Sequence, residues 1–326
     1  MNSEFNNQEQ IINNTTIPIA PEGFRSGFVG IVGRPNVGKS TLMNKLVGQK
    51  VAITSPVAQT TRNRLRGILT TPEAQIIFVD TPGIHKPHHE LGRVLVQNAQ
   101  GAINSVDLVL FVVDSSTKAG GGDRFIVELL QRSQTPVILG LNKVDLQPTD
   151  SRSIDASYSE LIEGTNWPLV KFSALTAGAP LANAGQGIEK LQNLLIENLE
   201  PGPYYYPPDL VTDQPERFIM AELIREQILL QTRQEIPHSV AIAIERVEET
   251  PKITKVYAAI NVERQSQKGI LIGKKGSMLK EIGTQARQQI QKLIAGEVYL
   301  ELFVKVKPKW RQSRLQLAEF GYRLEE

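Results

Sequence analysis

Short apolar runs alternate with amphipathic stretches between residues 27 and 200. The runs are four to six residues long and rich in Val, Ile, Leu and Phe, as strands buried on both faces of a sheet should be. They are Phe28–Val32, Ile76–Val79, Leu108–Val113, Val137–Leu141 and Leu169–Phe172. Helical spacing lies between them, at Ser40–Val47, Glu90–Asn104, Asp123–Arg132 and Ile188–Leu199. This alternation predicts an α/β domain with a doubly wound, mainly parallel sheet.

A different pattern follows in the last third of the chain. The spacing predicts a helix at Glu216–Gln234, strands at Ser239–Glu248 and Ile253–Val262, a helix at Ser277–Ile294 and a strand at Val298–Val306. The order α-β-β-α-β differs from the alternation of the first domain. We therefore expect a second, smaller α+β domain.

Composition places the boundaries between these parts. Residues 1–24 are rich in Asn, Gln, Thr and Pro without a period, which predicts a flexible polar tail. The first domain then covers 25–200, a Pro- and Tyr-rich linker covers 201–215, and the second domain covers 216–326. Within the first domain, residues 177–187 are mostly small or polar, which predicts a long surface loop.

Overall composition excludes several classes of protein. The 326 residues are 40% hydrophobic and 21% charged, so the chain can bury real cores. No apolar run is long enough for a transmembrane helix, and the first residues do not resemble a secretory leader. The absence of cysteine excludes disulfides and thiolate metal sites. We expect a cytoplasmic protein.

The net charge of +2 is unevenly distributed. Residues 1–212 carry 17 basic and 19 acidic side chains, whereas residues 264–314 carry 12 basic and 3 acidic ones. A basic block of this kind suggests a polyanionic partner, although a charge excess alone also fits an ordinary solvated helix face.

A phosphate-binding pattern lies between the first predicted strand and the first predicted helix. Residues 33–40 match G-x-x-x-x-G-K-[ST], in which backbone N–H groups and the helix N-terminus surround phosphate oxygens. Lys39 is expected to meet the β- and γ-phosphates, and Ser40 to bind Mg²⁺. A chance glycine turn is the alternative. The predicted residues are Gly33, Arg34, Pro35, Asn36, Val37, Gly38, Lys39, Ser40 and Thr41.

Two further segments are typical of the Mg²⁺ and γ-phosphate contacts. Asp80-Thr-Pro-Gly83 follows a strand, so Asp80 can hold Mg²⁺ and Gly83 can bring its N–H to the γ-phosphate. In Gln59-Thr-Thr-Arg62, either Thr60 or Thr61 should meet Mg²⁺; Thr61 is preferred. An ordinary polar loop is the alternative. The predicted contacts here are Gln59, Thr60, Thr61, Asp80, Thr81, Pro82, Gly83 and Ile84.

Asn142-Lys-Val-Asp145 indicates which nucleotide is bound. A carboxylate at Asp145 can accept from N1–H and the 2-amino group of guanine, whereas adenine would leave it unpaired. The predicted base site is Asn142, Lys143, Val144, Asp145, Ser173, Ala174 and Leu175. All these segments end strands, where open α/β sheets bind ligands. The pattern predicts GTP and GDP as ligands and excludes a plain ATPase.

Hydrolysis needs a positioned water, and the sequence departs from many small G proteins here. Ile84 stands where a water-orienting Gln is common, so we expect Asn36 to hold K⁺ in place of an arginine finger. Turn capping by Asn36 is the alternative. The predicted catalytic groups are Asn36, Lys39, Thr61 and Gly83. His85, His88 and His89 are interpreted as exposed side chains and not as a metal site.

The basic block contains a second glycine loop. Gly273-Lys-Lys-Gly276 precedes a predicted helix, and in KH modules such a loop clamps the backbone of single-stranded nucleotides. A simple turn between helices is the alternative. The predicted RNA contacts are Gly269, Ile272, Gly273, Lys274, Lys275, Gly276, Lys305, Lys307, Lys309 and Arg311, with Arg314 just beyond. Trp310 could stack on a base, but packing of the last helix is preferred.

With these motifs in order, the chain resembles the Era family of bacterial GTPases. The resemblance runs from about Gly27 to the C-terminus and rests on GRPNVGKS, QTTR, DTPG, NKVD, SAL and GKKG. It implies an Mg²⁺-dependent GTPase domain followed by a type II KH domain. It also implies binding to the 3′ region of 16S rRNA, action in assembly of the 30S subunit coupled to cell growth, and a location in the cytoplasm and peripherally at the cell membrane. We expect a monomer.

GTP and Mg²⁺ are expected to order the loops near Thr61 and Gly83 and, through the 201–215 linker, to change the grip of the second domain on RNA. The rival interpretation is a signalling GTPase whose basic C-terminal domain docks to anionic lipid. The glycines at fixed spacing favour RNA, because attraction to lipid does not need them.

Overall fold

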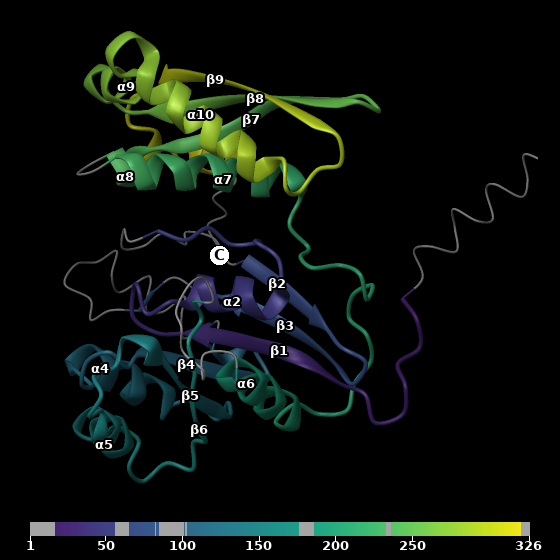
Figure 1. Ribbon diagram of the computed structural model, residues 1–326, viewed down its shortest axis with the longest axis vertical. Helices are drawn as coiled ribbons and strands as arrows, with labels where there is room; N and C mark the ends of the chain where they lie inside the picture. The colour runs from purple at the N-terminus through teal and green to yellow at the C-terminus, as the bar shows by residue number, and fades with distance from the viewer. Residues whose placement is uncertain are drawn as a thin grey trace, which may run out of the picture. The chain divides into compact units, whose positions relative to one another are not determined.

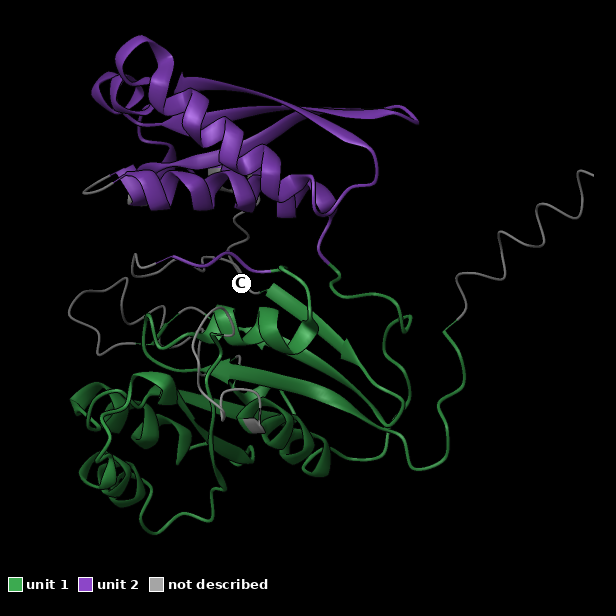
Figure 2. Cartoon of the chain, in the orientation of Figure 1, with its two compact units in different colours: residues 1–51, 64–213 green, residues 52–63, 214–326 purple. Residues whose placement is uncertain are grey.

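The computed structural model describes residues 17–55, 65–81, 83–84, 101, 103–175, 186–232 and 236–320. The chain divides into two compact units, one formed by residues 1–51 and 64–213 and the other by residues 52–63 and 214–326 (Figure 2). Each unit has its own sheet (Figure 1).

The first unit is built on a six-stranded sheet in the order β2-β3-β1-β4-β5-β6. β2 is antiparallel to β3 and the remaining pairs are parallel. The strands are β1 (Arg25–Val32), β2 (Leu65–Thr70), β3 (Ala74–Asp80), β4 (Leu108–Asp114), β5 (Val137–Asn142) and β6 (Leu169–Lys171). The helices are α2 (Lys39–Val47), α4 (Gly121–Leu130), α5 (Arg152–Leu161) and α6 (Gln186–Glu197).

The apolar runs of the sequence become the buried strands of this sheet. Every side chain of Leu108–Val113 is fully buried, because helices cover the faces of a parallel sheet. α4 and α5 pack on β4 and β5 in one hydrophobic cluster, while α2 contacts β2 and β3 and α6 contacts β6. The predicted α/β fold with a mainly parallel sheet is confirmed.

The Pro- and Tyr-rich segment, predicted as part of a linker over 201–215, lies within the first unit as far as residue 213. Gln75 on β3 accepts hydrogen bonds from the backbone N–H groups of Tyr205 and Tyr206 at 2.8 and 2.9 Å. The ring of Tyr204 lies 4.4 Å from that of Phe24. Aromatic side chains bury large areas, so this run packs along the sheet instead of spanning a gap.

The second unit has a three-stranded sheet in the order β7-β8-β9, with β7 antiparallel and β9 parallel to β8. Its strands are β7 (Ala241–Glu249), β8 (Ile253–Val262) and β9 (Glu297–Val306). Its helices are α7 (Glu216–Gln231), α8 (Ile236–Ser239), α9 (Gln265–Ile272), α10 (Ser277–Ile290) and α11 (Arg314–Glu319). Residues of α7, α9 and α10 form one core with the inner face of this sheet. The predicted α+β domain is confirmed.

The outer face of this second sheet is partly covered by the end of the chain. Trp310 is buried, packs edge-on against Phe320, and lies in a small cluster with Ala241. Its indole N–H donates to the Ser239 carbonyl at 3.1 Å. Trp310 therefore packs the C-terminal segment, as preferred from the sequence.

Several elements of the described part of the chain were not predicted from the pattern, among them β2, α5, α8 and α9. In the part of the chain that the structure describes, no helix is both long and apolar enough to cross a membrane. Most of the predicted loop at 177–187, most of the predicted helix at Glu90–Asn104 and most of the predicted tail lie outside the described residues. The last two residues of the predicted loop belong instead to α6, which begins at Gln186.

Candidate nucleotide and nucleic-acid sites

The phosphate loop joins the end of β1 to the start of α2. Asn36 and Gly38 have left-handed backbones, with φ of 63° and 98°. At Gly33, a Cβ would lie 2.3 Å from the Val112 carbonyl oxygen, so no larger residue fits there. The sequence thus folds this segment into a tight loop in front of a helix N-terminus, the arrangement that binds anions.

Lys39 lies inside this loop. Its side chain is buried, and its Nζ donates to the carbonyl oxygens of Arg34 and Gly33 at 3.0 and 3.2 Å. Burial lowers the pKa of Lys39 to about 8, with Asp80 acting in the opposite direction. An ammonium group held by carbonyl oxygens at the centre of the loop is well placed to exchange them for phosphate oxygens.

The two described Mg²⁺ ligands predicted from the sequence are brought together. Ser40 Oγ, at the start of α2, donates to Asp80 Oδ2, at the end of β3, at 2.8 Å. Within the described residues no group of three His, Asp or Glu could hold a metal by itself. A hydroxyl and one carboxylate suit Mg²⁺, which usually takes its other ligands from water and nucleotide phosphates.

Asn142 ties three of the motifs together. Its Nδ2 donates to the Val37 carbonyl at 2.8 Å, and its Oδ1 accepts from the Ala174 N–H at 2.9 Å. A Cβ on Gly38 would lie 2.4 Å from the same Nδ2. The side chain thus links the phosphate loop to both predicted base segments.

The predicted base site forms around Asp145. Ser173 Oγ donates to Asp145 Oδ1 at 2.5 Å, so the end of β6 orients the carboxylate. Lys143 has a left-handed backbone with φ of 65°, and its Nζ donates to the Asn36 carbonyl at 2.9 Å. The contact from Lys143 holds the predicted base segment 142–145 at a fixed distance from the phosphate loop. Leu175, also predicted here, is largely exposed.

Asp114 contacts the predicted base site, and the motif analysis missed it. It ends β4, and its Oδ2 accepts from Lys143 Nζ at 2.6 Å. Burial would raise the pKa of Asp114, but the hydrogen bonds from Lys143 and Ser116 outweigh it and lower the pKa. The sequence pattern could have identified Asp114, because it directly follows a buried apolar run, as Asp80 and Asn142 do.

The described part of the γ-phosphate segment packs against the phosphate loop. The Ile84 N–H donates to the Gly33 carbonyl at 3.1 Å, and a Cβ on Gly83 would lie 2.8 Å from Pro35 Cα. Thr81 Oγ1 donates to the Ile31 carbonyl at 2.8 Å, which fixes the strand end. The predicted residues outside the described part of the chain are Gln59, Thr60, Thr61 and Pro82, together with His85, His88 and His89.

The second glycine loop joins α9 to α10. Gly273, Lys275 and Gly276 have φ of 70°, 51° and 80°. Lys274 and Lys275 are exposed, and Ile272 packs against the core. The loop therefore presents bare backbone and two cations at the start of a fourteen-residue helix. That is the geometry expected of a clamp for a nucleic-acid backbone.

Three of the other predicted RNA contacts, Lys305, Lys307 and Arg311, are engaged in ion pairs. Lys305 Nζ lies 2.5 Å from Glu245, Lys307 Nζ 3.1 Å from Glu319, and Arg311 Nη2 2.5 Å from Glu263. Val304 and Val306 belong to the core, so Lys305 between them projects from the outer face of the sheet, whereas the glycine loop joins helices of the inner face.

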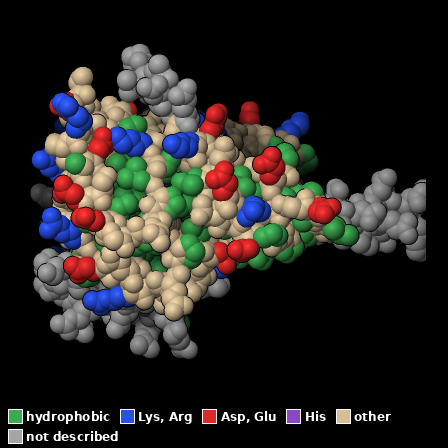
Figure 3. All heavy atoms as spheres, turned by 90° about the horizontal axis from the view of Figure 1, so that it is seen from below, with side chains coloured by type: hydrophobic (Ala, Val, Ile, Leu, Met, Phe, Trp, Pro, Cys, Tyr) green, Lys and Arg blue, Asp and Glu red, His purple; other side chains and the backbone are tan. Residues whose placement is uncertain are grey.

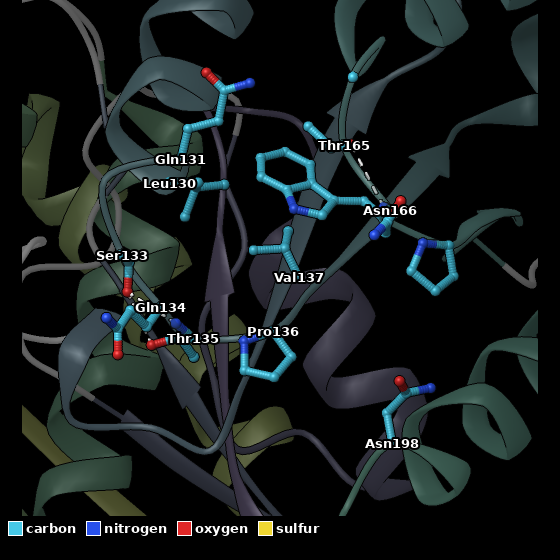
Figure 4. A pocket seen from close by; sticks show the side chains of 13 residues that line it. Leu130, Gln131, Ser133, Gln134, Thr135, Pro136, Val137, Thr165, Asn166 and Asn198 are labelled. Atoms are coloured by element: carbon cyan, nitrogen blue, oxygen red, sulfur yellow. Dashed lines mark hydrogen bonds between the residues drawn. The ribbon is translucent and has the colours of Figure 1, made fainter.

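Two surface features carry no ligand assignment. A hollow of about 470 Å³ lies at the start of β5, the end of that strand away from Asn142, and its lining includes Gln131, Gln134, Asn166 and Asn198 (Figure 4). It contains none of the predicted site residues. On the face shown in Figure 3, basic and acidic side chains are interspersed and neither sign forms a continuous patch.

Comparisons with known proteins give matches over both units. The family described as 50S ribosome-binding GTPase matches residues 28–143, and the KH domain family matches residues 235–311. The chain is 74% identical to GTPase Era of Rippkaea orientalis over 95% of this chain and 96% of that protein. It is 73% identical to GTPase Era of Crocosphaera subtropica over 96% and 98%.

Solved structures agree. A crystal structure of Era in complex with MgGDPNP and nucleotides 1506–1542 of 16S ribosomal RNA is 38% identical, with a TM-score of 0.83, over 92% of this chain and all of that one. An Aquifex aeolicus Era variant bound to GDP·AlF₄⁻ is 37% identical, with a TM-score of 0.82 and the same coverage.

Proposed function

The chain belongs to the Era family of GTPases, and from this premise we propose that it grips the 3′ region of 16S rRNA under the control of its bound nucleotide, during assembly of the small ribosomal subunit. The observation that carries the proposal is the Gly273–Gly276 loop. It combines left-handed backbone with exposed lysines at a helix start, inside the region that matches KH domains. A relative of 38% identity is seen with an rRNA fragment.

The nucleotide site does the work of a GTPase. Asp145, held by Ser173, is placed to accept the two N–H groups of guanine, and Asn142 fixes the distance from base to phosphates. Ser40 and Asp80 would hold Mg²⁺, which neutralises charge on the phosphate oxygens. Lys39 then binds the β- and γ-phosphates.

Water for hydrolysis must be positioned without a side chain from residue 84. Ile84 is buried and has no polar side-chain atom, and its N–H donates to the Gly33 carbonyl. K⁺ held with the help of Asn36 would supply the positive charge that an arginine finger supplies elsewhere. Turnover should then be faster in KCl than in NaCl at equal ionic strength, and Asn36→Ala should remove the difference. Equal rates in the two salts for the unmodified chain would refute a role for K⁺.

A contact within the second unit supports the coupling of nucleotide to RNA. The buried Glu226 on α7 accepts hydrogen bonds from the N–H and Oγ1 of Thr54 at 2.8 and 3.3 Å. Thr54 precedes the predicted Mg²⁺ segment Gln59–Arg62 by a few residues, so the second unit holds the chain that leads into it. RNA bound to this unit would therefore prefer one nucleotide state.

The test compares RNA affinity in the two nucleotide states. A labelled RNA corresponding to nucleotides 1506–1542 is titrated with the full chain, saturated with Mg²⁺ and either GDPNP or GDP. We expect affinities that differ by about fivefold or more, the usual range of allosteric coupling. Equal affinities would refute the coupling, and no binding in either state would refute the RNA function.

The location and assembly state follow from the same proposal. A protein that acts on a ribosomal subunit works in the cytoplasm, and any membrane contact would be peripheral. We propose that the chain acts as a monomer, because each copy contains both a nucleotide site and an RNA loop. A signalling GTPase that docks to lipid is not favoured, because lipid attraction requires neither the glycine spacing nor the KH match.

A further inference from the structure

The phosphate loop has a side-chain anchor that lies outside all of its motifs. Arg34, the second residue of the loop, donates from Nε to Asp123 Oδ1 at 2.7 Å. Asp123 is in the first turn of α4, 89 positions along the chain. Its side chain is fully buried, whereas that of Arg34 is 33% exposed. A fully buried carboxylate is costly unless it is paired, so this contact has to be maintained.

The surroundings of the pair are shaped for it. A Cβ at Gly122 would lie 2.7 Å from Arg34 Cδ, so the absence of a side chain lets the arginine stem pass. Asp123 Oδ2 accepts the Gly120 N–H at 2.9 Å, which caps the helix. One carboxylate oxygen therefore fixes the rotation of the group while the other faces Arg34.

The phosphate loop needs such anchors because its backbone is strained. A left-handed backbone at a residue other than glycine, as at Asn36, is less favourable than the right-handed form, although asparagine tolerates it better than most residues. Asn142 and Lys143 hold the carbonyl oxygens of Val37 and Asn36, which belong to the middle of the loop. Neither of these two bonds reaches the start of the loop.

The Arg34 side chain is a further hold on the start of the loop, where the Gly33 carbonyl also accepts the Ile84 N–H. The Arg34 carbonyl oxygen is also an acceptor for Lys39 Nζ, at 3.0 Å. The position of the Arg34 peptide therefore helps to set both the curvature of the loop and the resting place of the phosphate-binding lysine.

We infer that Arg34 and Asp123 form a positioning pair that sets the phosphate loop for its ligand and thereby controls the affinity for guanine nucleotides. Asp123 acts on the nucleotide through Arg34, and the Arg34 side chain acts through its own backbone. The inference concerns the nucleotide site alone and does not depend on RNA binding.

The first test replaces Arg34 and leaves the helix cap intact. Arg34→Gln keeps much of the side-chain length and removes the cation. We expect the affinity for a fluorescent GDP to fall about tenfold, mainly through faster dissociation. The KM for GTP should rise by a similar factor with kcat changed less than threefold, because Asp80 and Gly83 are untouched.

A second arginine–aspartate pair provides the control. Arg66 Nη1, on β2 in the same unit, lies 2.7 Å from Asp213, and neither residue belongs to a predicted nucleotide motif. Arg66→Gln should leave GDP affinity within twofold. If Arg34→Gln also leaves it within twofold, or if both variants weaken GDP equally, the pair is merely structural and the inference is overturned.

Two further variants keep the test decisive if Arg34→Gln folds poorly. Arg34→Lys retains the charge without the Nε–H, and we expect GDP to dissociate about threefold faster. Adding Asp123→Asn to Arg34→Gln removes the unpaired buried charge and should recover part of the affinity. An unchanged dissociation rate in Arg34→Lys, or no recovery in the double variant, would count against a positioning role.

The affinity for the rRNA fragment, measured without nucleotide, should stay the same in all of these variants. This measurement separates the inference on the nucleotide site from the proposed RNA function.

Discussion

The phosphate loop of the first unit and the glycine loop of the second share one backbone feature. In each, a left-handed glycine immediately precedes a helix, and a residue other than glycine takes a left-handed conformation one or two positions before that glycine. In the phosphate loop these residues are Asn36 and Gly38, at φ of 63° and 98°, ahead of α2. In the second unit they are Lys275 and Gly276, at φ of 51° and 80°, ahead of α10.

The surroundings of the two loops differ. A Cβ on Gly38 would collide with Asn142, and the lysine that follows is buried. A Cβ on Gly276 would meet nothing within 4 Å, and Lys274 and Lys275 are exposed. A left-handed glycine before a helix thus belongs to a braced loop, suited to one small ligand, in the first unit and to an open clamp, suited to a long polymer, in the second.

The largest expected effect tests the preference of the nucleotide site in the first unit for guanine. Asp145→Asn replaces the acceptor for two guanine N–H groups by an amide that can donate. Each hydrogen bond to a charged group contributes about 1.5–3 kcal/mol, so affinity for GDP should fall at least a hundredfold. Xanthosine diphosphate, which presents an acceptor at that position, should bind the variant better than GDP does. Competition against a fluorescent nucleotide measures both, and an unchanged preference for GDP would contradict the assignment.

The next effect tests the open clamp. Replacing Lys274 and Lys275 together by Asp should weaken binding of the rRNA fragment by about a hundredfold or more and leave GDP affinity unchanged. The slope of log affinity against log salt should become shallower by about 1.4, that is, about 0.7 for each lost phosphate contact on a single strand.

The matched control makes the same change of charge elsewhere on the second unit. Lys280→Asp with Lys292→Asp alters two exposed lysines outside the loop. An equal loss of RNA binding in the control would show that total charge, and not the loop, holds the RNA. That result would favour the lipid-docking interpretation of the basic block.

A smaller effect compares the two glycines directly. Gly38→Ala should weaken GDP binding more than tenfold, because the new methyl displaces Asn142 as well as straining the backbone. Gly276→Ala strains only the backbone, by about 1 kcal/mol, and should weaken RNA about fivefold. Titration of both ligands against both variants measures this, and equal losses at the two loops would contradict the difference in bracing.

The smallest effect is the pH dependence of nucleotide binding. The pKa of Lys39 is lowered to about 8 in the folded chain, below its value of 10.5 in the unfolded chain. Between these values the unfolded chain holds the proton and the folded chain does not, so this group makes folding more favourable as pH rises. Phosphate needs the charged lysine, so GDP binding must take up a proton above about pH 8. Affinity should fall about sevenfold from pH 7 to about pH 8.8, and a flat profile with no proton uptake by calorimetry would contradict it.

Local patterns predicted most of the fold and the nucleotide site. Leu108–Val113 reads as a buried strand because every position is apolar, and the motif residues follow from their places at strand ends. β2 was not predicted because Leu65–Thr70 is a short edge strand whose apolar run is interrupted by Arg66 and Gly67. α5 was not predicted because Ile154 and Tyr158 are its only buried residues, which is too few for a clear helical period of apolar side chains.

The contact between Arg34 and Asp123 could not be predicted from the sequence. The two residues lie far apart along the chain, Asp123 belongs to no motif, and only the packing of α4 beside the phosphate loop joins them. Asp114 could have been found, because it ends a strand as the motif residues do. Short-range patterns therefore identify the groups that touch a ligand better than those that hold these groups in place.

The most direct measurement is a calorimetric titration of the unmodified full chain with GDP and with ADP. Both nucleotides carry the same phosphates, so the braced loop alone cannot distinguish them, and the difference reports on Asp145 with its supports Ser173 and Asn142. GDP is expected to bind at least about a thousandfold more tightly. Affinities within tenfold of each other would contradict the account.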